Sequence, residues 1–172
     1  MTAEAKIFGI AGWSGSGKTT LVVKLLPVFT GRGHAVSTVK HAHHSFDIDT
    51  PGKDSYEHRV AGATEVLVSS VARWALIHEH RGAPEPSLAE LTVHMAPVDL
   101  LLIEGFKRDS YERLEVHRPL VGKDLLCLAD DQVVAVASDA ELPSVTVPVI
   151  DLDDIRAIAD LIVARCGLKN FN

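Results

Sequence analysis

Residues Gly12-Trp13-Ser14-Gly15-Ser16-Gly17-Lys18-Thr19 match the pattern G-x-x-x-x-G-K-[ST] in full. The motif constrains the fold because it requires a strand before it and a helix after it. The apolar run 7–11 is typical of a buried parallel strand, and a helix is predicted over 18–30. Glycines let the backbone point its N–H groups inward, and the start of the helix adds positive charge. The sequence therefore predicts a site for the phosphates of a nucleoside triphosphate.

Each residue type in this motif has an expected task. Lys18 is expected to contact the β- and γ-phosphates, and the hydroxyl of Thr19 is expected to bind Mg²⁺. The expected phosphate-binding set is Gly12, Gly15, Ser16, Gly17, Lys18, Thr19 and Thr20.

A second part of such a site is an acid on a neighbouring strand. The most apolar predicted strand, 98–104, ends in Glu104. Ligands of open α/β sheets bind beyond the carboxyl ends of the strands, so Glu104 is expected to face the metal, to bind it through water, or to activate the hydrolytic water. Asp99 lies near the start of the same strand, about 16 Å farther back, and is interpreted as a strand-start or cap residue.

Predicted strands alternate with predicted helices along the chain. This order is typical of an α/β protein, here a three-layer P-loop NTPase fold with a mostly parallel, doubly wound sheet. At 172 residues, one nucleotide-binding domain over 1–172 is expected. Segment 107–126 is less regular and is interpreted as a small antiparallel extension, with a half-exposed strand at 114–118. The further predicted strands are 35–40, 65–69, 74–78 and 133–137, and the further predicted helices are 55–61, 88–94 and 152–166.

Composition narrows the partners and the compartment. The net charge of −6, from 17 basic and 23 acidic residues, argues against a general nucleic-acid or anionic-membrane surface. No stretch reaches the roughly 18 apolar residues of a membrane helix. Cys127 and Cys166 form no C-x-x-C pair, which suits thiols in a reducing compartment. A cytoplasmic protein that binds neither nucleic acid nor membrane is expected.

The segment 41–54 is rich in histidine and aspartate, including His43 and Asp47. Neutral imidazoles and carboxylates are ligands for transition metals. The same segment could instead be a mobile loop that contacts the γ-phosphate, the magnesium shell or the phosphates of a second substrate. It could also be a solvated polar loop, and the spacing alone leaves the three interpretations open.

Asp139 follows the predicted strand 133–137 and is the candidate for base recognition. A carboxylate there could accept hydrogen bonds from N1–H and the exocyclic amine of guanine, a pattern that adenine lacks. The alternative is that Ser138 and Asp139 only turn the chain. Because no full N-K-x-D signature is present, the residues alone leave guanine and adenine open.

Several segments together resemble the molybdopterin-guanine dinucleotide biosynthesis protein B (MobB) family. They are the P-loop, the run 40–55 from Lys40 to Ser55, Ile103-Glu104-Gly105-Phe106-Lys107, Glu115-Val116-His117-Arg118 and Ala137-Ser138-Asp139. The resemblance implies a homodimeric GTP-binding protein with Mg²⁺ and slow GTP hydrolysis. It also implies a role beside a MobA-type nucleotidyltransferase that attaches GMP to molybdopterin, with molybdopterin as a second ligand.

Two other functions share these sequence features. A metallochaperone GTPase could carry a metal on the histidine-rich segment 41–54, and a small-molecule kinase could use the same P-loop. A metal that stays bound through gel filtration would favour the first, and transfer of the γ-phosphate to an acceptor other than water would favour the second.

Overall fold

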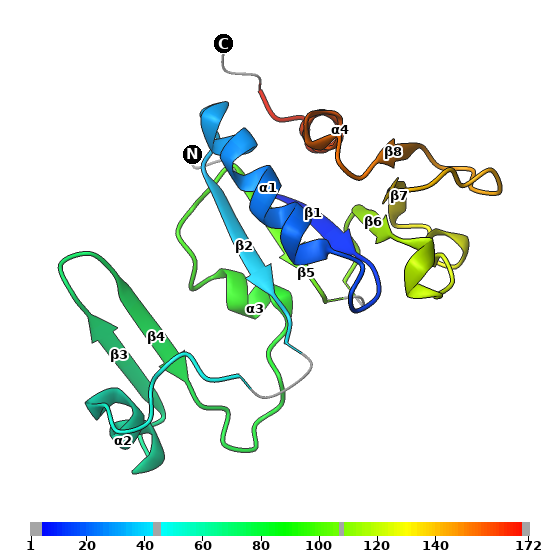
Figure 1. Cartoon of the computed structure of the whole chain (residues 1–172). Helices are drawn as coiled ribbons and strands as arrows, with labels where there is room; N and C mark the ends of the chain where they lie inside the picture. The colour runs from blue at the N-terminus through cyan, green and yellow to red at the C-terminus, as the bar shows by residue number, and fades with distance from the viewer. Residues whose placement is uncertain (1–4, 43–45, 107–108, 170–172) are drawn as a thin grey trace. The chain divides into compact units, whose positions relative to one another are not determined.

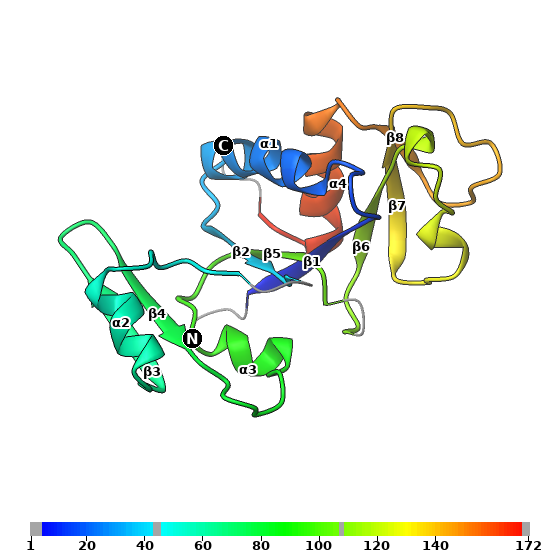
Figure 2. The same ribbon diagram turned by 60° about the horizontal axis from the view of Figure 1, so that its bottom comes forward.

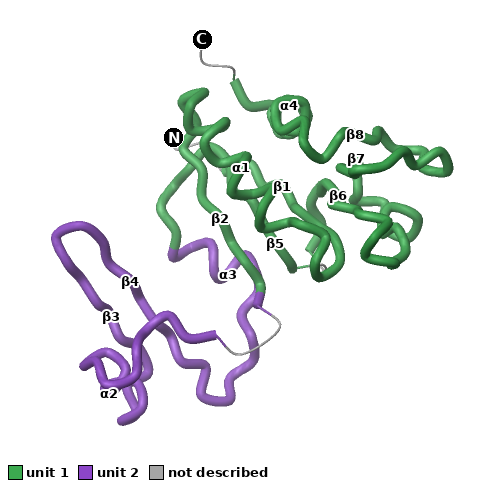
Figure 3. The backbone as a smooth tube through the Cα atoms, viewed as in Figure 1, with its two compact units in different colours: residues 1–41, 95–172 green, residues 42–94 purple. Residues whose placement is uncertain are grey.

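The computed structural model describes residues 5–42, 46–106 and 109–169 (Figure 1). The chain forms two compact units, one of residues 1–41 and 95–172 and the other of residues 42–94 (Figure 3). In the part of the chain that the structure describes, no helix is long and apolar enough to cross a membrane.

The larger unit is built on a six-stranded sheet in which every pairing is parallel. The strand order is β2-β5-β1-β6-β7-β8. The strands are β1 (Lys6–Ala11), β2 (Val36–Lys40), β5 (Leu100–Glu104), β6 (Arg113–His117), β7 (Val133–Ser138) and β8 (Val149–Asp151). The chain passes from β1 to β2 and back to β5 on one side of β1, and then to β6, β7 and β8 on the other side. The loop after β1 therefore lies where the direction of winding reverses, which is where ligands bind in such sheets.

Helices α1 (Lys18–Gly31) and α4 (Ile155–Cys166) lie on the same face of this sheet and pack against each other (Figure 2). Leu21, Leu25 and Phe29 recur every four residues and are buried, which forms the apolar stripe of α1. They join a core of apolar side chains from the sheet and α4, including Phe8, Ile10, Leu102, Leu114, Val116, Ile158 and Ile162. This core holds the P-loop between a buried strand and a buried helix face.

The smaller unit contains helix α2 (Asp54–Val60), strands β3 (Glu65–Ser69) and β4 (Trp74–His78), and helix α3 (Leu88–Thr92). The two strands form an antiparallel hairpin. Ser87 and Glu90 form a capping box at the start of α3. The mostly parallel α/β fold with a small antiparallel part is therefore confirmed.

The antiparallel part lies elsewhere than predicted. The prediction at 107–126 is wrong, because β6 in that segment pairs in parallel with β1 and β7. All five side chains of β6 are buried, so the strand is not half-exposed. Its alternating polar residues suggested a solvent-facing side, but Glu115 is buried and accepts hydrogen bonds from the backbone N–H groups of Leu126 (2.8 Å) and Cys127 (2.9 Å). A charged side chain with such partners can occupy an inner strand.

Candidate nucleotide site

The loop after β1 has the backbone conformation that its glycines permit. Gly12 has φ of 141°, and a Cβ on it would lie 2.5 Å from the carbonyl oxygen of Val116 on β6. Gly17 has φ of 102° and immediately precedes α1. Any other residue at Gly12 would collide with the neighbouring strand, so this glycine lets the loop pass close to the sheet edge.

The ammonium group of Lys18 lies over the same loop. It donates hydrogen bonds to the backbone carbonyls of Gly12 (3.0 Å) and Trp13 (2.9 Å). The side chain therefore folds back along the loop instead of extending into solvent. This places a positive charge where the motif predicts the phosphates.

Thr19 and Glu104 meet at the carboxyl ends of the central strands. Register pairs Ile10 of β1 with Glu104 of β5, and Glu104 in turn with Lys40 of β2. The hydroxyl of Thr19 donates to the carboxylate of Glu104 at 3.3 Å. The ammonium of Lys40 lies 3.3 Å from the Thr19 hydroxyl and 3.5 Å from the Glu104 carboxylate. Lys40 was not among the predicted site residues, although its place at the end of a predicted strand was a usable signal.

These groups suit a magnesium ion in their chemistry. Hydroxyl and carboxylate oxygens are the ligands that Mg²⁺ prefers. The ammonium group of Lys40 contacts both Thr19 and Glu104, so the oxygens of these two residues already bind a cationic group. In addition, the hydroxyl of Ser16 is buried and has no hydrogen-bond partner within the described ranges. A buried hydroxyl of this kind is usually satisfied by a ligand or by water.

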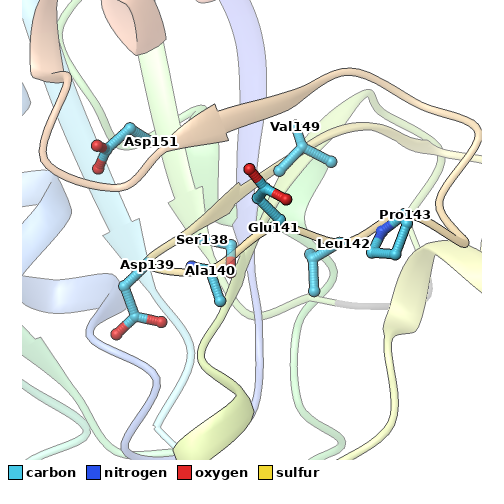
Figure 4. Close-up of a pocket in the computed structure, with 8 residues that line it drawn as sticks. All are labelled: Ser138, Asp139, Ala140, Glu141, Leu142, Pro143, Val149 and Asp151. Carbon is cyan, nitrogen blue, oxygen red and sulfur yellow. Dashed lines mark hydrogen bonds between the residues drawn. The ribbon is translucent and has the colours of Figure 1, made fainter.

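Asp139 follows β7 at the edge of a pocket of about 470 Å³. The pocket is lined by Ser138, Asp139, Ala140, Glu141, Leu142, Pro143, Val149 and Asp151 (Figure 4). In this view Asp139 lies at the end of the pocket away from Pro143. Its carboxylate accepts a hydrogen bond from Nη1 of Arg118 at 3.0 Å. Asp139 therefore has a charged partner as well as a position beside a pocket.

Arg118 also contacts the P-loop, and its role was not predicted. Its Nε donates to the carbonyl of Ser16 at 3.2 Å. The only sequence signal for Arg118 was its place in the segment Glu115-Val116-His117-Arg118, one of those that resemble the MobB family.

The acidic residues of segment 41–54 have partners within the smaller unit. Arg59 on α2 donates to Asp47 (2.9 Å), to Asp49 (2.9 Å) and to Glu79 (3.2 Å). The hydrogen bond to Asp49, with the charges of the neighbouring carboxylates, raises the pKa of Arg59 above its usual value. This arrangement explains both aspartates as anchors that hold the loop against α2.

A cavity of about 630 Å³ lies beside this cluster, lined among others by Phe46, Asp47, Arg59, His78 and Arg81. His43, the other predicted residue of the segment, lies outside the described residues. Among the residues that are described, no three His, Cys, Asp or Glu side chains are grouped to hold a metal ion.

A parallel sheet whose first strand leads through G-x-x-x-x-G-K-T into a helix defines the class: this is a P-loop protein with the fold of nucleoside-triphosphate-binding domains. The family model for molybdopterin guanine dinucleotide synthesis protein B, MobB, matches residues 7–139. The chain belongs to this family.

Relatives agree with this assignment over nearly the whole length. The chain is 41% identical over 167 residues to the molybdopterin-guanine dinucleotide biosynthesis adapter protein of Escherichia coli, covering 95% of each chain. It is 36% identical to the protein of the same name from Haemophilus influenzae, covering 94% of this chain and 90% of the relative. A crystal structure of molybdopterin-guanine biosynthesis protein B aligns with TM-score 0.71 and 25% identity, covering 92% of this chain and 98% of that one. These names support neither a metallochaperone nor a kinase.

Proposed function

We propose that the chain binds GTP with Mg²⁺ at the P-loop, hydrolyses it slowly, and serves as an adapter in the synthesis of molybdopterin-guanine dinucleotide. Membership of the MobB family and the adapter names of the relatives support the pathway. The observation that supports nucleotide binding is the full P-loop, with Thr19 in contact with Glu104 from the neighbouring strand.

The geometry supports a role for each part of the proposed site. The N–H groups of the loop and the ammonium of Lys18 bind the phosphates, because both are positive groups at the start of α1. Thr19 and Glu104 hold Mg²⁺, which when bound neutralises charge on the phosphates. Asp139 selects guanine through its carboxylate, beside the pocket that follows β7. With the base and the phosphates held at separate loops, the nucleotide spans the carboxyl edge of the sheet.

The adapter role needs partners. A MobA-type nucleotidyltransferase is the proposed enzyme partner, and molybdopterin is the proposed second ligand of segment 41–54. The cavity beside Arg59 supports this choice, because it combines charged side chains with the apolar residues Phe46, Ile48 and Ile77. Ligand sites of this mixed character are common in proteins.

The chain is also proposed to be a homodimer, and the hairpin supports this part. Cross-strand pairing puts Leu67 opposite Leu76 and Trp74 opposite Ser69, so three apolar side chains share one face. Leu67 and Trp74 are 62% and 63% exposed, and Leu76 is 37% exposed. A two-stranded hairpin with such a face is stabilised when a second surface covers it.

The nucleotide and adapter parts can be tested separately. Calorimetric titration should give tighter binding of GTP than of ATP, dependent on Mg²⁺, and a second heat on addition of molybdopterin. Absence of triphosphate binding would overturn the nucleotide proposal. For the adapter part, adding the chain to a MobA-type nucleotidyltransferase, GTP and molybdopterin should raise the yield of the dinucleotide, and an unchanged yield would contradict it.

The dimer is tested by light scattering after gel filtration. Trp74→Glu should shift the parent dimer to a monomer, because a charge on the apolar face of the hairpin opposes its burial. Val23→Glu, on the exposed side of α1, is the matched control and should leave the dimer intact. A dimer that survives Trp74→Glu would place the contact on another surface.

A further inference from the structure

Arg118 is the first residue after β6, and its guanidinium contacts two loops that are far apart in the sequence. Its Nε donates to the backbone carbonyl of Ser16 in the P-loop at 3.2 Å. Its Nη1 donates to Oδ2 of Asp139, after β7, at 3.0 Å. One rigid, planar group therefore joins the loop expected at the phosphates to the loop expected at the base.

The bond to Ser16 determines how the P-loop is oriented. In a trans peptide the C=O and the next N–H point in opposite directions. When Arg118 holds the Ser16 carbonyl, the N–H of Gly17 is directed away from Arg118. Gly17 has the left-handed φ of 102° and precedes α1, so its N–H belongs to the group that would receive phosphate oxygens. Arg118 thereby stabilises the loop conformation that binds an anion.

The bond to Asp139 orients the second loop. Only Oδ2 of Asp139 accepts from Arg118 among the described contacts, and a carboxylate has further acceptor positions. Asp139 can therefore keep Arg118 and still accept from a base. The ion pair is 40% exposed on both side chains, so its main effect is orientation and not net stability.

The geometry points to Arg118 as a positioning residue for nucleotide binding, which keeps the P-loop and the Asp139 loop in their binding conformations at the same time. This inference rests on the proposed nucleotide site. It assigns Arg118 no contact with the reacting atoms. Because both loops share one side chain, substitutions at Arg118 and Asp139 should not act independently.

The test compares Arg118→Ala and Arg118→Lys with the parent chain and with Arg156→Ala, an exposed arginine on α4. Arg118→Ala should weaken GTP binding about tenfold, because a charge-assisted hydrogen bond to the loop is lost. Arg118→Lys should recover part of this loss, since an ammonium can contact one loop but lacks the fork that joins both. Arg156→Ala should bind GTP like the parent.

Two further readouts separate positioning from general stability. In Arg118→Ala combined with Asp139→Asn, the losses in GTP affinity should be less than multiplicative. In the ligand-free protein, ¹⁵N relaxation should show the amides of Gly15 to Lys18 more mobile in Arg118→Ala than in the parent, with equal melting temperatures.

The relaxation measurement needs no nucleotide. It therefore tests the role of Arg118 in the P-loop even if the parent chain does not bind GTP and the proposed function is wrong. P-loop amides as rigid as in the parent would overturn the inference. Parent-like GTP affinity in Arg118→Ala, or fully independent effects in the double variant, would overturn it as well.

Discussion

The hydroxyl of Thr19 donates to the carboxylate of Glu104 at 3.3 Å, although 85 residues separate them in the sequence. The contact exists because β1 and β5 are parallel neighbours, so the loop after one strand meets the last residue of the other. Two oxygen groups of the kind that Mg²⁺ prefers are thus brought together by the pairing of strands and not by a local motif.

Glu104→Gln should lower magnesium-dependent GTP hydrolysis about a hundredfold or more. Glu104 is the proposed ligand of a metal ion on the phosphates, and such an ion stabilises the transition state by several kcal/mol. Nucleotide binding without Mg²⁺ should remain, since the P-loop backbone is unchanged. Phosphate release in the presence and absence of Mg²⁺ measures both effects. Glu57→Gln, exposed on α2, is the control. Hydrolysis at the parent rate in Glu104→Gln would place the metal ligand elsewhere.

Lys18→Ala should weaken GTP binding by at least about 2 kcal/mol, because a charge-assisted contact with phosphate is lost. Calorimetric titration measures the change, and Lys53→Ala, an exposed lysine before α2, serves as the control. Guanosine has no phosphate, so its affinity for Lys18→Ala should equal its affinity for the parent chain and for Lys53→Ala. Unchanged GTP affinity in Lys18→Ala would remove the basis for a phosphate site at this loop.

Two substitutions in segment 41–54 test the second ligand. Asp47→Ala and His43→Ala should leave GTP affinity nearly unchanged and strongly reduce formation of molybdopterin-guanine dinucleotide in a reconstituted assay. Asp49→Ala is the control for a loss of stability, as distinct from a loss of contact with the ligand. The side chain of Asp49 is 5% exposed and that of Asp47 is 63% exposed, so Asp49→Ala should lower the melting temperature more. Full dinucleotide yield with Asp47→Ala and His43→Ala would mean that the segment is only a solvated surface.

Asp139→Asn should lower GTP affinity and raise affinity for xanthosine triphosphate, because the new amide can donate to the carbonyl at C2 of xanthine. A mismatch of buried donors and acceptors is worth about 1–3 kcal/mol. Competition binding with GTP, ATP and xanthosine triphosphate measures the preference. Glu141→Gln, in the same pocket, is the matched control. An unchanged preference in Asp139→Asn would make Asp139 a turn residue.

The ionisation of Tyr111 makes the stability of the folded chain depend on pH in the alkaline range. Its hydroxyl donates to the carbonyls of Gly105 (2.8 Å) and Phe106 (3.0 Å), and burial raises the pKa of Tyr111 from 10.0 to about 12. Between these values the unfolded chain loses the proton while the folded chain keeps it. The folded chain then binds more protons, so its stability is complete below pH 10 and falls as pH rises toward 12.

Tyr111→Phe should therefore be less stable than the parent at pH 8, by about 1 kcal/mol for the lost hydrogen bonds, and should lose less stability above pH 10. Urea unfolding of both proteins between pH 8 and pH 11 measures the difference. Both chains keep Cys166, whose burial raises its pKa to about 11, so the slope that it adds cancels in the comparison. Parallel pH profiles would exclude Tyr111 as the source.

Local sequence patterns were sufficient for much of the fold. The P-loop, the helix that follows it and the two strands of the hairpin were all predicted from residues close in sequence, and the structure has each of them. Glu104 was found at the predicted strand end, in contact with Thr19.

Features that depend on distant pairing could not be predicted in the same way. The order of strands is not encoded in local patterns, so the place of Lys40 at a strand end did not put it beside Glu104, and Arg118 was not expected to bridge two loops. The three-residue strand β8 is too short to carry a periodic pattern. For β6, the alternation of polar and apolar residues predicted exposure, because the backbone N–H groups that Glu115 binds belong to Leu126 and Cys127, which come later in the chain.

The buried polar side chains of β6 have a consequence for folding. Arg113 is held by the carbonyl of Asp109 (2.7 Å) and by Asp130 (3.5 Å), and Glu115 by two backbone N–H groups. A slip of one residue in the pairing of β6 would turn each of its side chains to the opposite face of the sheet. The charged groups of Arg113 and Glu115 would then be buried in the middle of the sheet without partners. Misregistered intermediates are thereby penalised, so the strand admits only one alignment between β1 and β7.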